Sequence, residues 1–200
     1  PYLGMEHQTI NAYGNNYKKT NRGYDFILFH EAGHEWWGNY ISVADWSDFW
    51  IHEGICTYAE SMYIEEKFGL ESAKNFIDER FKKNITNTAP MVPERNSNAN
   101  LESGNDVYYK GAHALHMLRY IIGKETLWAS LKEYLQMPKE LPDNQTSTDE
   151  FISLIEENSG MKLDWFFNQY FFKKELPTLK KLEKTINNKI KKKAEIFARV

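Results

Sequence analysis

The sequence predicts a mainly helical fold with a small β element. Candidate capping residues precede, and glycines follow, a series of segments with sequence patterns typical of helices. The N-terminal segment lacks helix caps and ends in a stretch rich in Gly and Asn. Of the 200 residues, 42% are hydrophobic and 15% are aromatic, which is enough to bury one sizeable core. We therefore expect one domain, with at most a short appendage.

The N-terminal part is expected to form a short strand and then a helix. Residues 2–12 are predicted to contain the strand, followed by a loop over residues 13–16. Asp25 is a candidate cap for a helix that continues to about Tyr40.

Two more helices are expected next in the chain. Ser47 or Asp48 can cap a helix that Gly69 ends, and a third helix follows over residues 70–83. Residues 84–105 hold most of the loop signals and predict a long irregular connection of the kind that often borders a site.

The remaining elements are also predicted to be helices. We expect them over residues 106–122, 124–137 and 163–172, and between the capping box at residues 147–150 and a stop at Gly160. Beyond Leu179 the prediction is open between a helix and a hairpin.

Charge and composition exclude several classes of protein. Residues 179–200 hold eight basic and two acidic residues, a net of +6, so a total of −3 leaves −9 on residues 1–178. Such an acidic body argues against a nucleic-acid partner and suits a cationic ligand such as a free amine. No apolar run approaches the about 20 residues of a transmembrane segment. A single cysteine, Cys56, excludes an internal disulfide framework.

The segment His30-Glu31-Ala32-Gly33-His34 carries the clearest chemical signal. Histidines four residues apart on a helix project from one face, so both imidazoles can bind one metal ion. Glu31 would then stand beside the ion as a general base. A catalytic zinc takes three protein ligands. Glu53, on the next predicted helix, is our candidate for the third.

This pattern, with 18 residues between His34 and Glu53, resembles that of the gluzincins, and its surroundings resemble the aminopeptidase N-type zinc peptidases. The resemblance includes the segments at residues 36–39 and 46–54. Gly4-Met5-Glu6-His7 is similar to the exopeptidase motif of that family, Gly-x-Met-Glu-Asn. Tyr108-Tyr109-Lys110-Gly111-Ala112 is similar to its Tyr-x-Lys-Gly-Ala segment.

The resemblance implies a zinc-dependent aminopeptidase that releases N-terminal residues from peptides, with one Zn²⁺ bound by His30, His34 and Glu53. It further implies Glu31 as the general base, Tyr108 as the donor to the oxyanion, and Glu6, with Met5 and Gly4, as the site for the amine of the substrate. His7 departs from the family, which usually has Asn there. Simple packing remains the alternative for Tyr108, and a solvent-exposed carboxylate for Glu6.

The resemblance also implies a thermolysin-like catalytic domain over residues 1–178, truncated at its N-terminus. Residues 179–200 would be a linker or the start of a following domain, and we expect further flanking domains in the parent protein. A thermolysin-like endopeptidase and an inactive zinc-binding fragment are the alternative functions.

Other residues with metal-ligand chemistry are expected to be structural. His52, His113 and His116 are predicted to be structural or solvent-exposed. For Asp48, a helix cap and a hydrogen bond to a metal-binding imidazole are equally favoured. Trp36, Trp37, Trp46 and Trp50 are predicted to lie in the core.

Overall fold

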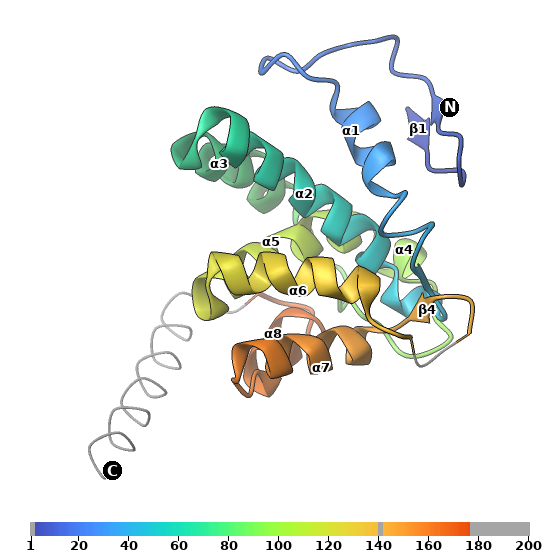
Figure 1. Ribbon diagram of the computed structural model, residues 1–200, viewed down its shortest axis with the longest axis vertical. Helices are drawn as coiled ribbons and strands as arrows, with labels where there is room; N and C mark the ends of the chain where they lie inside the picture. The colour runs from blue at the N-terminus through green and yellow to red at the C-terminus, as the bar shows by residue number, and fades with distance from the viewer. Residues whose placement is uncertain (1–2, 140–141, 177–200) are drawn as a thin grey trace.

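The computed structural model describes residues 3–139 and 142–176, and helices make up most of this part of the chain (Figure 1). The N-terminal hairpin and helix α1 lie at one end, and helices α7 and α8 lie at the other. The predicted mainly helical fold with a small β element is thus confirmed. The prediction for residues 179–200 lies outside the described residues.

The β element at the N-terminus is a two-stranded antiparallel hairpin. Strands β1 (Gly4–Met5) and β2 (Ala12–Tyr13) pair with Gly4 opposite Tyr13. The Tyr13 hydroxyl donates to the Asp25 carboxylate, and Asn15 Nδ2 donates to Asp25 Oδ1 at 2.9 Å. These bonds fasten the hairpin to the start of α1.

Helix α1 (Phe26–Gly33) begins where the sequence predicts, but it ends before Tyr40. Asp25 Oδ1 caps it by accepting from the backbone nitrogens of the second and third helical residues, at 3.1 and 3.3 Å. Beyond Gly33 the amides of Asn39 and Tyr40 bond to carbonyls five residues back. Gly38 has a φ of +137°, which an α-helix cannot contain. The predicted helix therefore becomes a series of turns.

The second predicted helix is split in two. A 3₁₀ turn, η1 (Trp46–Asp48), is capped by Asp45 rather than by Ser47 or Asp48, and α2 (Trp50–Phe68) follows and ends at Gly69.

The predicted third helix consists of α3 (Leu70–Phe76) and a π-helix, η2 (Ile77–Lys82). Such π-helical turns are rare and occur often near functional sites.

The C-terminal helices agree with the sequence prediction. They are α5 (Asp106–Ile122), α6 (Lys124–Gln136), α7 (Thr148–Ser159) and α8 (Asp164–Tyr170), preceded by the short α4 (Ala99–Glu102) within the predicted irregular segment. Ser147 Oγ accepts from the Glu150 amide at 3.3 Å, as a capping box requires. The structure also contains a parallel pair that the sequence does not predict, β3 (Ser42–Val43) with β4 (Gln145–Thr146).

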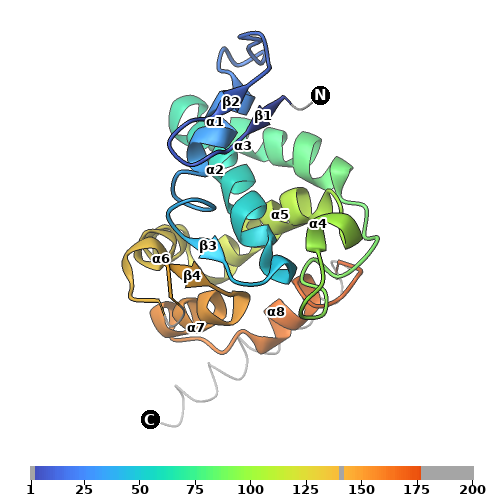
Figure 2. The same ribbon diagram turned by 90° about the vertical axis from the view of Figure 1, so that its right-hand side faces the viewer.

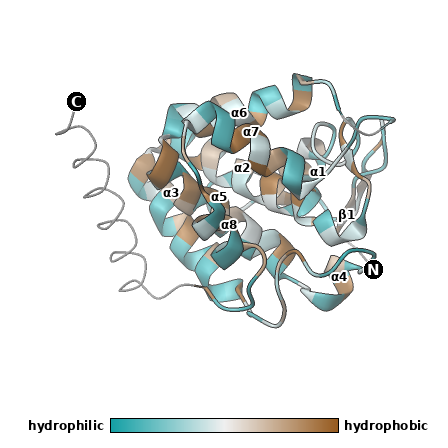
Figure 3. Cartoon of the chain, turned by 90° about the horizontal axis from the view of Figure 1, so that it is seen from below, coloured by the Kyte–Doolittle hydropathy of each residue, from teal (hydrophilic) through white to brown (hydrophobic). Residues whose placement is uncertain are grey.

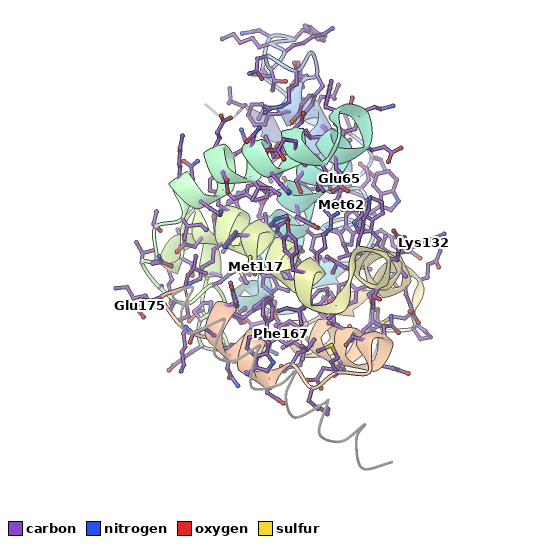
Figure 4. All side chains as sticks on the ribbon, turned by 90° about the vertical axis from the view of Figure 1, so that its left-hand side faces the viewer. Met62, Glu65, Met117, Lys132, Phe167 and Glu175 are labelled. Atoms are coloured by element: carbon purple, nitrogen blue, oxygen red, sulfur yellow. The ribbon has the colours of Figure 1, made fainter. Side chains whose placement is uncertain are left out.

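Helices α2 and α5 cross at the centre of the core, and two glycines allow their close approach. A Cβ atom added at Gly54 would lie 3.0 Å from the Val107 carbonyl oxygen and 3.1 Å from the Gly111 Cα. The crossing places Glu53, next to Gly54, close to Tyr108, which lies one turn before Gly111. Figure 4 shows these helices with Met62 of α2 and Met117 of α5 labelled; both pack against the core.

The core contains only part of the predicted tryptophan set. Trp50 is fully buried and Trp37 packs against the core, but Trp36 and Trp46 are 53% and 55% exposed, so their prediction as core residues is wrong. Hydrophilic and hydrophobic residues are mixed along the helices (Figure 3). None of the described helices combines the length and apolar character that a membrane span requires.

Candidate metal centre and active-site cavity

Three potential ligand atoms from α1, its C-cap and α2 converge on one point. Nε2 of His30 lies 3.1 Å from Glu53 Oε2 and 3.2 Å from Nε2 of His34, and His34 Nε2 lies 3.4 Å from the same carboxylate oxygen. A tetrahedral zinc with bonds of about 2.0–2.1 Å separates its ligand atoms by about 3.3 Å. The predicted ligand set therefore has the spacing that a zinc ion needs.

The contacts of His34 Nδ1 determine which ring nitrogen faces this point. Its Nδ1 lies 3.0 Å from the carbonyl oxygen of Trp37 and 3.5 Å from Cys56 Sγ. Because a carbonyl can only accept, Nδ1 carries the hydrogen and Nε2 offers a lone pair.

His30 is held in the same way by Glu60, a buried residue of α2. Its Nδ1 lies 3.4 Å from Glu60 Oε1. The Nε2 atoms of both histidines and a Glu53 oxygen thus face one another as acceptors. Three acceptors at this spacing repel unless a cation lies between them.

In the metal-free chain, protons can supply that positive charge. Burial disfavours a charged His30, but hydrogen bonds to Glu53 and Glu60 outweigh it and raise its pKa to about 10. Conversely, burial raises the pKa of Glu53, but hydrogen bonds from His30 and His34 outweigh burial and lower it to about 2. The site therefore favours positive charge, and two imidazoles with one carboxylate are a donor set that suits zinc.

Glu31 lies directly under strand β1. It is buried, and a Cβ atom added at Gly4 would lie 2.2 Å from Glu31 Oε1, so a side chain at position 4 would displace this carboxylate. Burial raises the pKa of Glu31, while His30 and His34 act to lower it. A raised pKa suits a carboxylate that exchanges a proton near neutral pH.

Glu6 directly follows strand β1, which lies beside α1 (Figure 2). A carboxylate oxygen of Glu6, one of Glu31 and a ring nitrogen of His34 lie within 4.8 Å of one another. Asn39 Nδ2 donates to the Glu6 carbonyl at 2.9 Å and so fixes the strand to the turn after His34. Glu6 is half-buried, so its side chain remains accessible to a ligand.

Two neighbouring tyrosines of α5 line the site, and they differ in their contacts. The Tyr108 hydroxyl donates to Glu53 Oε1 at 2.9 Å, and its ring stacks on His30 at 6.1 Å between centroids. Burial, with the nearby Glu53, raises the pKa of Tyr108, which keeps its hydroxyl protonated and able to donate. Tyr109 lines the cavity without a hydrogen bond to Glu53.

All eight predicted site residues line one cavity of 740 Å³, a volume within the usual range for ligand sites. They are Gly4, Met5, Glu6, His30, Glu31, His34, Glu53 and Tyr108. The wall also includes Phe26, Thr57, Glu60, Arg80 and Tyr109. The hairpin, α1, α2, η2 and α5 each contribute to it.

The structure places the remaining candidates away from the metal point. Asp48 is buried against Arg95 and the Thr148 hydroxyl, both at 2.6 Å, so neither alternative for Asp48 is correct. His52 Nε2 accepts from the Val43 amide at 3.1 Å, a structural role as predicted.

His113 and His116 are buried beside a separate cavity of 230 Å³. The prediction that they are structural or exposed residues fits this position.

Glu60 and Lys110 have roles in the structure that were not predicted from the sequence. Glu60 follows Glu53 by seven residues, two helical turns, so helical periodicity alone could have placed it on the same face. Lys110 is fully buried, and its Nζ donates to the backbone carbonyls of Lys173, at 3.0 Å, and of Lys174. This contact, between residues 63 positions apart, leaves no local signal in the sequence.

A family model matches most of the chain. The model of the peptidase family M1 domain matches residues 5–170, which include every predicted site residue except Gly4.

Relatives of the chain are aminopeptidases by name. It is 28% identical over 171 residues to a glutamyl aminopeptidase of Bitis rhinoceros, covering 72% of this chain and 17% of that protein. It is 30% identical over 118 residues to endoplasmic reticulum aminopeptidase 2 of Bos taurus, covering 55% and 12%. The chain thus spans less than a fifth of the length of these relatives.

Solved structures share the fold. An M1 zinc metallopeptidase from Deinococcus radiodurans matches with a TM-score of 0.73 and 21% identity, over 90% of this chain and 38% of that one. A yeast LTA4 hydrolase in complex with bestatin matches with a TM-score of 0.67 and 21% identity, over 89% and 31%.

Proposed function

Since this chain belongs to peptidase family M1, we propose that it is the zinc-binding catalytic part of an aminopeptidase, which releases N-terminal residues from peptides. The observation that carries the proposal is the triangle of His30, His34 and Glu53 ligand atoms, 3.1–3.4 Å apart, in the wall of one cavity. The names of the relatives support the reaction class.

One zinc ion is the cofactor that we propose, bound by His30, His34 and Glu53. Zinc supplies a Lewis acid that polarises the scissile carbonyl and lowers the pKa of water. Glu60 and the Trp37 carbonyl would hold the two imidazoles in the orientation that binding requires, through the contacts described above.

Glu31 is our candidate for the general base. Its carboxylate would accept a proton from the attacking water and pass it to the nitrogen of the leaving group. Its burial and its raised pKa support this role, because a more basic carboxylate holds the transferred proton longer.

Tyr108 is our candidate for stabilising the oxyanion. Its hydroxyl reaches Glu53 at 2.9 Å and so lies beside the metal point. A donor at this place can bond to the negative oxygen that develops as water attacks the carbonyl.

Glu6 would determine that cleavage occurs next to the N-terminus. Its half-buried carboxylate, grouped with Glu31 and His34, can pair with the α-ammonium group of a peptide. Gly4 and Met5 would form the strand edge beside the first residue of the substrate. Such pairing fixes the distance between the amine and the bond that is cut.

We further propose a thermolysin-like arrangement for residues 1–178 and a separate segment for residues 179–200. The family match, which ends at residue 170, supports this division.

The test compares a peptide with its acetylated form. The zinc-loaded chain is incubated with Ala-Ala-Ala and N-acetyl-Ala-Ala-Ala, and the released products are measured by mass spectrometry. We expect cleavage of the free peptide alone, because acetylation removes the charge that Glu6 would bind. Glu6→Ala should lower kcat/KM for the free peptide about 10- to 150-fold, the equivalent of one charge-assisted contact.

Two results would contradict the proposal. Equal cleavage of both peptides would favour the endopeptidase alternative. A chain that holds zinc and cleaves neither peptide would favour the inactive zinc-binding fragment.

A further inference from the structure

Arg80 stands apart among the residues that line the active-site cavity. It belongs to the π-helix η2, and among the described lining residues it is the one with a permanent positive charge. Its Cζ lies 4.4 Å from the ring centre of Phe26 and 6.0 Å from that of Tyr109, also cavity residues. Stacking on aromatic faces holds a guanidinium in place while its edge stays free for an anion.

The Arg80 guanidinium uses few of its hydrogen-bond donors within the described part of the chain. Its ion-pair contact is from Nε to Glu60 Oε2, at 3.6 Å, and Nε has no hydrogen-bond partner there. Glu60 also serves His30 through its other oxygen. An arginine carries five N–H donors, and the two Nη groups of Arg80 make no hydrogen bond within residues 3–139 and 142–176. The side chain is 28% exposed, so a ligand can reach it.

Arg80 and Glu6 lie at opposite ends of α1. Glu6 groups with Glu31 and His34 at the C-terminal end, whereas Arg80 stacks on Phe26, the first residue of the helix. His34 lies eight positions after Phe26, which corresponds to about 12 Å along the axis. An extended di- or tripeptide spans about 7–10 Å from amine to carboxylate. A charge-assisted contact of about 2.8 Å at each end extends this reach to about 12–16 Å.

A peptide whose amine is held at Glu6 therefore passes the metal point and reaches Arg80 with its second or third residue. These residues lie on the leaving side of the scissile bond. The direction follows from the positions of Glu6 and Arg80, and it rests on the proposed function for the placement of the amine.

We propose that Arg80 recognises a carboxylate on the leaving part of the substrate. The carboxylate can be the C-terminal group of a di- or tripeptide, or an acidic side chain directly after the scissile bond. Either would meet the free Nη donors in the paired geometry that arginine and carboxylate share. Arg80 would then set a preference for short or acidic peptides.

The test measures binding without turnover. The zinc-loaded Glu31→Gln chain is titrated by calorimetry with Ala-Ala and Ala-Ala-Ala, each against its C-terminal amide, and with Ala-Glu-amide against Ala-Gln-amide. We expect at least one carboxylate peptide to bind about 10-fold more tightly than its neutral partner, as for a partly exposed charge-assisted contact. The pair that shows the difference identifies the source of the carboxylate.

Two substitutions in the same background assign the difference to Arg80. Arg80→Gln should reduce the ratio of dissociation constants within each pair to less than about twofold. Arg22→Gln is the matched control, because Arg22 lies 5.5 Å from the Phe76 ring centre but does not line the cavity. This control should leave the ratio unchanged.

The ratio separates recognition from support of the fold. A loss of Glu60 support or of zinc in Arg80→Gln would weaken both members of a pair equally, and a ratio that stays at its original value would overturn the proposal. A chain that shows no preference or no binding of carboxylate peptides would overturn it too. Because this experiment measures binding and no hydrolysis, its result can be told apart from a failure of the proposed aminopeptidase reaction.

Discussion

At the scale of single residues, Tyr108 and Tyr109 offer a direct comparison, because both line the cavity and only Tyr108 bonds to Glu53. We predict that Tyr108→Phe lowers kcat by about 10²–10³ with little change in KM, the usual loss for one oxyanion donor. Tyr109→Phe is the matched control and should change kcat less than about threefold. Steady-state kinetics with a zinc-loaded chain measures both. A large loss of kcat in Tyr109→Phe alone would show that the oxyanion donor is Tyr109 and not Tyr108.

The candidate site residues differ in how well the sequence predicts them. His30, His34 and Glu31 follow from helical spacing within five residues, and the structure places their side chains as that spacing requires. Arg80 gives no such signal, because its position in the cavity depends on a π-helical turn and on packing against Phe26. The contacts of Asp48 differ from both predictions because its partners, Arg95 and Thr148, come from distant parts of the chain.

At the scale of elements, the crossing of α2 and α5 positions Glu53 against Tyr108. We predict that Gly54→Val lowers the free energy of unfolding by about 1–3 kcal/mol, because the added atoms meet the backbone of α5. Displacing α5 should also lower kcat while zinc is retained. Glu66→Val, on the exposed face of α2, is the control and should cost only about 0.5 kcal/mol of helix propensity. Urea unfolding tests both, and equal stability of Gly54→Val and the unsubstituted chain would contradict the close approach.

Helix α5 also carries a pH-dependent contribution to stability. Burial, followed by nearby positive groups, lowers the pKa of His116 from 6.5 to about 4, so the unfolded chain binds a proton between pH 6.5 and 4 that the folded chain does not. Stability should therefore fall as the pH falls through this window, by up to about 1.4 kcal/mol per pH unit for this group.

His116→Gln should remove that part of the slope. The measurement is the free energy of unfolding in urea at pH 7.5, 6 and 5, for the variant and the unsubstituted chain. The difference between the two slopes isolates His116 from the metal-site groups, and identical slopes would show that burial does not keep this imidazole neutral.

The helix ends show where prediction from sequence reaches its limit. Asp25, Ser147 and Gly160 act at their predicted ends, because caps depend on residues within one turn. The early end of α1 and the β3–β4 pair were not predicted. The β3–β4 pair depends on Ser42 and Val43 meeting residues 145–146, about a hundred positions away. The early end of α1 accompanies the turns around Gly38, whose positive φ the sequence does not reveal.

At the scale of the whole molecule, the N-terminal hairpin, α1, α2, η2 and α5 together enclose the one cavity that holds the candidate metal point. The match to the peptidase family M1 domain spans residues 5–170 and so covers nearly all of these elements. The mainly helical class was predictable, because it depends on many local signals. The exposure of Trp36 and Trp46 was not, because aromatic content alone does not tell which surface a side chain faces.

Zinc content tests the central claim most directly. Purified chain, exposed to zinc and then dialysed, should hold about one zinc per chain by atomic emission, and His34→Ala should hold much less because a three-ligand site loses one ligand. His7→Ala, which alters an exposed histidine, should match the unsubstituted chain. Circular dichroism should show that both variants remain helical. Equal zinc in His34→Ala and in the unsubstituted chain would contradict the assignment of the metal centre.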